Sequence, residues 1–145
     1  MEYFGVRIAV HMILIKDNNI LLGRRINTNW MPDKYNLPAG HLEENETLID
    51  AVIRETKEEV GIFVLSKDIE YVHMMQRMER GYIDIFFRAN LWEGEAYIAE
   101  PHKCDDVKWF PLDNLPDNII PSQKLGIELA LKGVTFSEFD PADNK

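Results

Sequence analysis

Three glutamates near the middle of the chain carry the chemistry that the sequence most clearly indicates. On a helix with ~100° per residue, Glu55 and Glu59 lie one turn apart and Glu58 lies beside them. Like charges four residues apart repel by roughly 0.2–0.5 kcal/mol when exposed, and by more when partly desolvated. A divalent ion such as Mg²⁺ or Mn²⁺ would offset this repulsion, because these ions prefer carboxylate, carbonyl and water oxygens. The spacing predicts a metal site, although it also fits an acidic amphipathic helix, since Glu favours helices.

Two neighbouring residues are candidates to complete such a site. Gly40 lies at a bend before the helix, and its backbone carbonyl could supply a further ligand because glycine permits close approach. Arg54 precedes Glu55 but points about a quarter turn away from it on a helical wheel. We therefore expect Arg54 to buttress the neighbouring loop or carboxylates.

The helix that carries these glutamates is predicted from Thr47 to Val60, with Thr47 as its N-cap and Gly61 as its C-cap. Its core-facing stripe is predicted to contain Ile49, Ile53, Thr56 and Val60, with Leu48 and Val52 at one side. The three glutamates would then line the edge of the buried face, where partial desolvation makes a cation more necessary.

The rest of the chain predicts a mixed sheet with helices, in the α/β (α+β) class. A long apolar strand over 5–15 and a second strand from 20 suggest a hairpin, and residues 35–40 suggest a short strand and a sharp bend. Further strands are predicted at 70–77, 82–91 and 107–110, and a second helix at 121–131. We expect one domain over 1–145, with a C-terminal tail from about 134.

Composition narrows the class of function. The formal net charge of −9 argues against binding a nucleic-acid polymer, which requires clustered Lys and Arg. Cys104 is the single cysteine, so no internal disulfide can form, as suits a reducing compartment. The N-terminus shows no signal-peptide pattern, and the apolar stretches are too short for a membrane span. We expect a cytoplasmic protein with no membrane partner.

The segment from Gly40 to Ile62 resembles the Nudix box, the signature of the Nudix hydrolase family. The matching residues are Gly40, Glu46, Arg54, Glu55, Lys57, Glu58, Glu59, Gly61 and Ile62, at the spacings of that signature. All of its fixed positions are present. Thr56 departs mildly from a position that is usually apolar, and Ala39 stands where Gly is frequent.

This resemblance implies a fold and a site. The fold would be a Nudix-type α/β/α sandwich with a mixed β-sheet and the Nudix loop–helix–loop. Glu55, Glu58 and Glu59 would be both metal ligands and catalytic residues, with the Gly40 carbonyl as a further ligand. Arg54 would orient these groups, and Glu46 would steady the loop. The cofactor would be Mg²⁺, with Mn²⁺ as a substitute, and a homodimer is one assembly that the resemblance suggests.

The resemblance also implies hydrolysis of a diphosphate linkage in a small nucleotide. The segment Glu100–Asp105, followed by Trp109 and Phe110, resembles the MutT-like branch that cleaves nucleoside triphosphates. The reaction would use Glu55 or Glu59 as general base and would release a nucleoside monophosphate and pyrophosphate. A modified or oxidised triphosphate is included in this class. Two alternatives remain: a nucleoside diphosphate linked to another group, such as ADP-ribose, and a non-catalytic domain that senses nucleotides.

Several residues are candidate substrate contacts, each with a structural alternative. Trp30 and Tyr35 could stack on a base or simply pack in the core or a loop. Gln123 could bond a base edge or serve only as a polar residue at the start of the second helix. The candidate phosphate contacts, which could equally be solvated surface charges, are Arg77, Arg80, Arg88 and Lys103.

Overall fold

The computed structural model describes residues 1–143. The elements, in chain order, are β1 (Arg7–Lys16), β2 (Asn19–Arg25), β3 (Tyr35–Asn36), β4 (Ala39–His41), α1 (Leu48–Val60), β5 (Glu70–Arg77), β6 (Tyr82–Ala89), β7 (Cys104–Pro111), α2 (Pro121–Leu131) and β8 (Phe136–Phe139), with short 3-10 turns at Ser66–Asp68 and Pro141–Asp143. The predicted helices and strands are confirmed, with shifts of a few residues at the ends of several strands.

Strand β1 is the centre of a mixed sheet with the order β3-β2-β1-β6-β5-β8. It pairs in parallel with β6, and antiparallel with β4 through Val10 and Gly40, while its C-terminal end forms the hairpin with β2. Strand β7 extends the sheet by pairing with β2. Because β1 is covered on both faces, it is apolar almost throughout, as a buried central strand must be.

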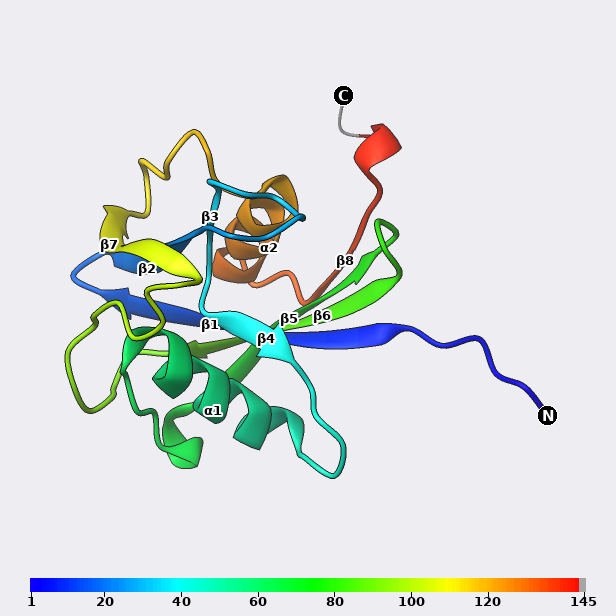
Figure 1. Ribbon diagram of the computed structural model, residues 1–145, viewed down its shortest axis with the longest axis horizontal. Coiled ribbons are helices and arrows are strands. Elements are labelled where there is room, and N and C mark those ends of the chain that lie inside the picture. Colours follow the sequence, from blue (N-terminus) through cyan, green and yellow to red (C-terminus); the bar gives the residue numbers. More distant parts are fainter. Residues whose placement is uncertain (144–145) are drawn as a thin grey trace.

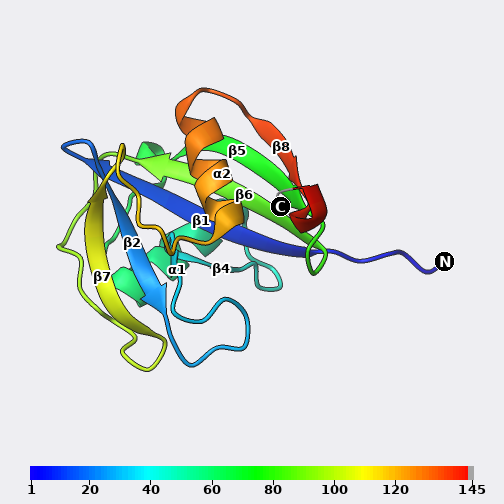
Figure 2. The same ribbon diagram turned by 90° about the horizontal axis from the view of Figure 1, so that it is seen from above.

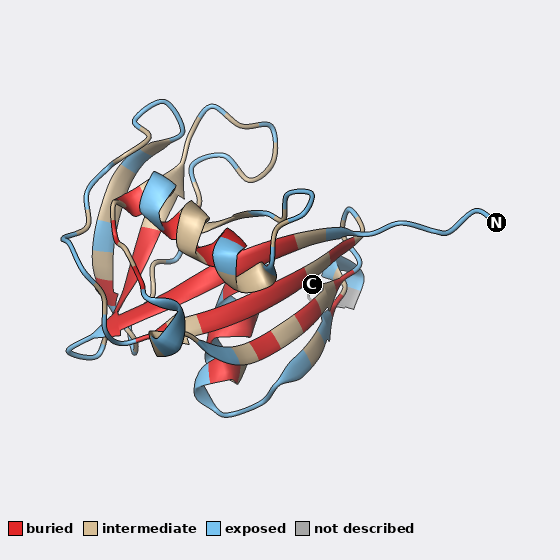
Figure 3. Cartoon of the chain, turned by 90° about the horizontal axis from the view of Figure 1, so that it is seen from below, coloured by how far each residue is buried: buried red, intermediate tan, exposed pale blue. Residues whose placement is uncertain are grey.

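Helices α1 and α2 cover opposite faces of this sheet (Figures 1 and 2), which gives the α/β/α sandwich that the sequence predicts. Alternate residues of β1 face the two layers: Val10, Met12 and Leu14 pack on the α1 side, while Ile13 and Ile15 pack on the α2 side. The buried residues therefore form two hydrophobic clusters, one on each face of the sheet. Figure 3 shows buried residues along the central strands.

Helix α1 is capped as predicted but is rotated slightly from the predicted orientation. The Thr47 side chain accepts a hydrogen bond from the Asp50 amide, and Gly61 ends the helix in the left-handed conformation. Ala51 and Val52 are completely buried, together with Thr56 and Val60. Ile49 is half-buried and packs against the core cluster, as predicted, whereas Ile53 is half-buried and belongs to neither core cluster. The rotation turns the small Ala51 toward the sheet and carries the glutamates with it.

The C-terminal segment corrects a second prediction. Residues 136–139 form β8, which pairs in parallel with β5 from Met74 to Arg77. The tail predicted from about residue 134 therefore contains an edge strand of four residues, whose Phe139 is buried in the core. The last two residues of that predicted tail, Asn144 and Lys145, lie outside the described residues. Within residues 1–143, neither helix has the length and apolar character needed to cross a bilayer.

Candidate active site

Arg54 makes hydrogen bonds to both the loop and the helix that carry the glutamates. Its Nε donates to Glu46 at 2.7 Å, and its Nη1 donates to Glu55 at 2.8 Å and to Glu58 at 3.3 Å. Its Nη2 reaches Glu46 at 3.0 Å and the carbonyl oxygen of His41 at 3.3 Å. A single guanidinium therefore ties the loop before α1 to the acidic face of the helix, with the charge-assisted geometry for which Arg is suited.

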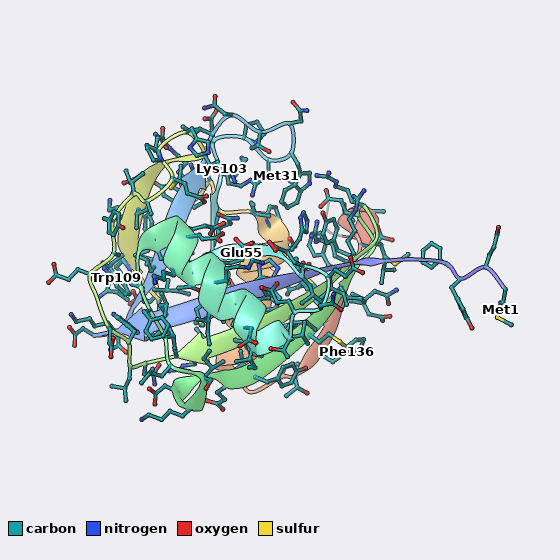
Figure 4. All side chains as sticks on the ribbon, turned by 60° about the horizontal axis from the view of Figure 1, so that its bottom comes forward. Met1, Met31, Glu55, Lys103, Trp109 and Phe136 are labelled. Carbon is teal, nitrogen blue, oxygen red and sulfur yellow. The ribbon has the colours of Figure 1, made fainter. Side chains whose placement is uncertain are left out.

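Glu55 and Glu59 face the short strand β4. The Glu59 carboxylate accepts a hydrogen bond from the Ala39 amide at 2.9 Å. The Glu55 carboxylate lies against Gly40 so closely that a Cβ at that position would overlap it. Gly40 is therefore needed for close approach, as a bend beside a polar site requires. Figure 4 shows Glu55 near the middle of the molecule, on the side of α1 toward the loops that carry Met31 and Lys103.

The charges of these carboxylates are incompletely balanced. Burial raises the pKa of Glu59 well above its ordinary value, and the nearby Glu55 and Glu100 act in the same direction. Burial also raises the pKa of Glu55, against the opposing effect of Arg54. Among the ion pairs of residues 1–143, none involves Glu59. The charged forms of Glu55 and Glu59 are thus disfavoured by burial despite the guanidinium groups of Arg54 and Arg25, so a further cation would stabilise them.

The carboxylates do not, however, converge on one point in this structure. Over the described residues, no three His, Cys, Asp or Glu side chains are grouped as a metal cage. Arg54 engages Glu55 and Glu58, and the Ala39 amide engages Glu59, so these oxygens are directed to different partners. The donor set still fits a hard divalent ion, since all of its members are oxygens and their charge exceeds that of Arg54.

Two cavities flank the loop and strand that lead into this site. The first, of about 250 Å³, is lined by residues that include Arg25, Glu59, Glu100 and Lys103. The Lys103 amine lies 3.7 Å from the Glu100 carboxylate, so this predicted substrate contact stands at the rim of a cavity that reaches Glu59. The second cavity shares Arg25 with the first and has β4 in its wall.

The predicted substrate contacts differ in their surroundings. Trp30 lines the second cavity. Tyr35 instead lies in the core, where its ring packs on Phe110 and its hydroxyl donates to Asp106. These surroundings favour a role for Tyr35 in core packing rather than in stacking on a base. Tyr35 lines neither cavity. The reason is the pairing of β3 with β2, which turns the ring inward.

Gln123 lines the second cavity but is already engaged at both ends of its amide. Its carbonyl oxygen accepts from the Leu37 amide at 3.2 Å, and its nitrogen lies 3.0 Å from Nδ1 of His11. A contact from this side chain to a base edge would require one of these hydrogen bonds to break. Arg77 and Arg80 line the same cavity, whereas Arg88 lies outside both cavities, beside Asn90.

A buried polar network lies behind this cavity, and sequence reasoning missed it. Asp84 accepts from Arg77 Nε at 2.7 Å and lies 2.9 Å from His11 Nε2, and all three residues are buried. Their positions in apolar strands were the available signal, because charged residues are seldom fully buried unless paired. The network fixes Arg77 in the wall of the cavity.

Asp84→Asn is expected to destabilise the protein by about 3–5 kcal/mol, because it leaves Arg77 buried without its partner. Although burial opposes ionisation, His11 and Arg77 lower the pKa of Asp84 from 3.8 to about 2. A lowered folded-state pKa stabilises the fold above the unfolded pKa, and this stabilisation is lost as pH falls through the folded value. Urea unfolding should therefore show a wild-type advantage near neutral pH that shrinks as pH falls from 3.8 toward 2. An equal stability of the two proteins near neutral pH would contradict this role.

The fold and the acidic helix together define a class of protein, the pyrophosphohydrolases built as an α/β/α sandwich. The profile of the NUDIX domain matches residues 5–129, and the chain belongs to this family. It is a Nudix hydrolase, acting on diphosphate linkages of nucleotides, as the resemblance in the sequence predicted.

Similar proteins place the chain within this family. It is 35% identical over 125 residues to the ADP-ribose pyrophosphatase of Methanocaldococcus jannaschii, covering 85% of this chain and 72% of that protein. It is 29% identical over 140 residues to the 8-oxo-dGTP diphosphatase of Buchnera aphidicola subsp. Schizaphis graminum, covering 94% and 98%. It spans only 41% of the NAD-capped RNA hydrolase NudC of Pseudomonas aeruginosa, with 29% identity and 81% of this chain covered. A MutT NUDIX hydrolase structure from Burkholderia pseudomallei has the same fold, with TM-score 0.80, 23% identity and coverage of 86% and 98%.

Proposed function

We propose that this enzyme hydrolyses a nucleoside triphosphate, including modified or oxidised forms, to a nucleoside monophosphate and pyrophosphate with Mg²⁺ as cofactor. The observation that carries the proposal is the placement of Glu55 and Glu59 against the Gly40 bend, with Arg54 holding the loop and helix together. The similarity to the 8-oxo-dGTP diphosphatase, which extends over 98% of that protein, supports the triphosphate class.

The residues that would hold the metal are Glu55, Glu58 and Glu59, with the Gly40 carbonyl as a further oxygen. When bound, Mg²⁺ or Mn²⁺ neutralises charge on the phosphate oxygens and lowers the pKa of a bound water. Because the protein carries a net charge of −9, an anionic substrate would otherwise be repelled. Arg54 keeps Glu55 and Glu58 in place for this purpose through its hydrogen bonds.

The proton of the attacking water would go to Glu55 or Glu59. Both carboxylates face β4, but they differ in their partners, since Glu55 is held by Arg54 and Glu59 by the Ala39 amide. Each retains an oxygen that makes no hydrogen bond to the protein among the described contacts. Single replacements of these residues separate the two assignments.

A second substrate class is favoured by a specific similarity. The ADP-ribose pyrophosphatase of M. jannaschii is 35% identical over 125 residues, a higher identity than that to the Buchnera diphosphatase but over a smaller share of the relative. Its reaction cleaves the same kind of linkage, so the same glutamates would serve. The products distinguish the classes, because a diphosphate joined to a sugar releases two monophosphates and no pyrophosphate.

The test is a panel of nucleoside triphosphates, oxidised triphosphates and ADP-ribose, assayed with Mg²⁺, with Mn²⁺ and with a chelator. We expect pyrophosphate and monophosphate from a triphosphate, and loss of turnover when the metal is chelated. If ADP-ribose is the only compound of the panel that is hydrolysed, ADP-ribose replaces the triphosphate as the proposed substrate. Nucleotide binding without turnover on the whole panel would instead support the non-catalytic sensing domain. The cytoplasmic location and the homodimer stay predictions.

A further inference from the structure

The connection between β6 and β7, residues 90–103, lies against the C-terminal end of α1. The last carbonyl groups of a helix have no hydrogen-bond partner within the helix itself. Here the Tyr97 amide donates to the Val60 carbonyl at 3.0 Å, and the Ala99 amide donates to the Glu59 carbonyl at 3.3 Å. A distant segment of the chain therefore caps the turn of α1 that carries Glu59.

The Tyr97 side chain lies on the glycine that ends this helix. A Cβ added to Gly61 would overlap the Tyr97 ring. Gly94 approaches the same place from the connection, since a Cβ at Gly94 would lie 3.1 Å from the Gly61 carbonyl oxygen. Tyr97 is 60% exposed, so its ring adds little to the hydrophobic core. Its contact with the end of α1 is therefore the feature that its position requires us to explain.

The two ends of the connection are held by other contacts. Near its start, Glu93 and Phe63 exchange two backbone hydrogen bonds, at 2.9 and 3.0 Å. Near its end, the Asn27 side chain donates to the His102 carbonyl at 2.8 Å. Neither contact reaches the middle of the connection, residues 97–100. The attachment to α1 is therefore what fixes the middle of the connection in place.

The middle of the connection leads directly into two charged residues of the first cavity. Glu100 and Lys103 line this cavity together with Glu59 of α1. The amides of Lys103 and Cys104 both donate to the Glu100 carbonyl, at 2.9 and 3.0 Å, so these residues form one tight turn. A shift of residues 97–99 away from the helix would therefore move Lys103 relative to Glu59.

We propose that Tyr97 is a positioning residue, which holds the connection on the end of α1 and so places Lys103 to contact a phosphate group of the substrate. The assignment to the substrate rests on the proposed function. The Lys103 side chain is 65% exposed, so its reach is set by its backbone and not by packing around it. A lysine amine is a mobile point charge, and such a group depends on where its stem begins. Tyr97 lines neither cavity, so it acts only through other residues.

Amide hydrogen exchange without substrate tests the attachment. Tyr97→Ala should speed the exchange of residues 97–104 by about fivefold or more, because loss of the ring contact makes local opening easier. Tyr97→Phe keeps the ring, so its exchange should match the wild type. Tyr71→Ala removes a half-exposed tyrosine on β5 and should leave residues 97–104 unchanged. Exchange in Tyr97→Ala at the wild-type rate would overturn the proposal.

A comparison of three glycines isolates the contact with the ring. Gly61, Gly81 and Gly133 have φ of +73°, +69° and +79°, but of the three only Gly61 has a neighbour within 4 Å of an added Cβ. Gly61→Ala should therefore speed the exchange of residues 97–104, whereas Gly81→Ala and Gly133→Ala should not. Adding Tyr97→Ala to Gly61→Ala should cause little further change, because both changes break the same contact. Equal effects of the three glycine variants would contradict the role of the ring.

Turnover tests what the attachment positions. Tyr97→Ala should raise KM for a triphosphate by about fivefold while changing kcat less, as expected when a binding contact is lost. Lys103→Gln should raise KM similarly, and adding Tyr97→Ala to it should cause little further loss, because Tyr97 acts through Lys103. Tyr97→Phe should restore the wild-type KM, and Tyr71→Ala should leave it unchanged. Full additivity of Tyr97→Ala and Lys103→Gln would overturn the positioning role.

The two readouts separate this proposal from the proposed function. If the wild type hydrolyses no nucleotide but Tyr97→Ala still speeds the exchange of residues 97–104, the proposed function fails and the attachment by Tyr97 is supported. If the wild type hydrolyses a triphosphate and Tyr97→Ala leaves KM unchanged, the positioning role fails alone.

Discussion

Replacing Glu59 with Gln is expected to lower kcat by about 100-fold or more, the usual contribution of a group that accepts a proton or supports the metal. The fold should be retained. The Gln carbonyl oxygen can still accept the hydrogen bond from the Ala39 amide, and burial already disfavours the charged carboxylate at this position. Activity and stability should therefore separate in this variant, with the loss of turnover unaccompanied by a fall in Tm.

The measurement is kcat with saturating Mg²⁺, together with Tm, for Glu59→Gln and Glu55→Gln side by side. Glu70→Gln is the matched control, because Glu70 is an exposed glutamate on β5 that lines neither cavity. The proposed base should show the larger loss of kcat, and the other carboxylate should show a greater dependence on Mg²⁺ concentration. Near-normal turnover in both variants would remove the role assigned to these carboxylates.

Local sequence patterns were sufficient for most of the fold. The alternation and length of residues 70–77 specified β5, and Pro121 at the start of α2 specified that helix, because these signals lie within the elements themselves. Strand β8 was missed for a physical reason. Its residues 136–139 pair with β5, about sixty residues earlier, and a four-residue strand has too little pattern of its own to indicate a distant partner.

The candidate site was predictable in its residue types but not in its contacts. Helical spacing places Glu55 and Glu59 on one side of α1, and the structure has both against β4. Spacing could not show that Arg54 binds Glu46, Glu55 and Glu58 together, since Glu46 comes from the loop. The sequence predicted that Arg54 would buttress the loop or the carboxylates, but it did not show that its hydrogen bonds would draw Glu55 and Glu58 away from Glu59.

The second cavity was even less accessible from sequence, because its walls come from separate parts of the chain. Trp30 lies in the loop after β2, Arg77 at the end of β5, and Gln123 in α2. A polar residue within an apolar strand, such as His11 or Asp84, indicates that a buried partner exists but does not identify that partner. Here the partners lie 73 positions apart, and only the parallel pairing of β1 with β6 brings them together.

Gly40→Ala is expected to reduce kcat by about 100-fold while changing stability little, because a small displacement of a catalytic group has large effects on rate. The added Cβ would overlap the Glu55 carboxylate, which is the far end of a flexible side chain. That carboxylate can move away at low energetic cost, but it would then leave its place beside β4 and its hydrogen bond from Arg54. A side chain proposed as a metal ligand is thus also the one that yields to the clash.

The comparison that isolates this effect is Gly5→Ala, since a Cβ at Gly5 would meet nothing within 4 Å. Both variants should show Tm values close to the wild type, and only Gly40→Ala should lose turnover. Gly40→Ala combined with Glu55→Gln should be little slower than Glu55→Gln alone, because the two changes remove the same contribution and act non-additively. Full additivity of the two losses would show that Gly40 serves the reaction by some route other than the position of Glu55.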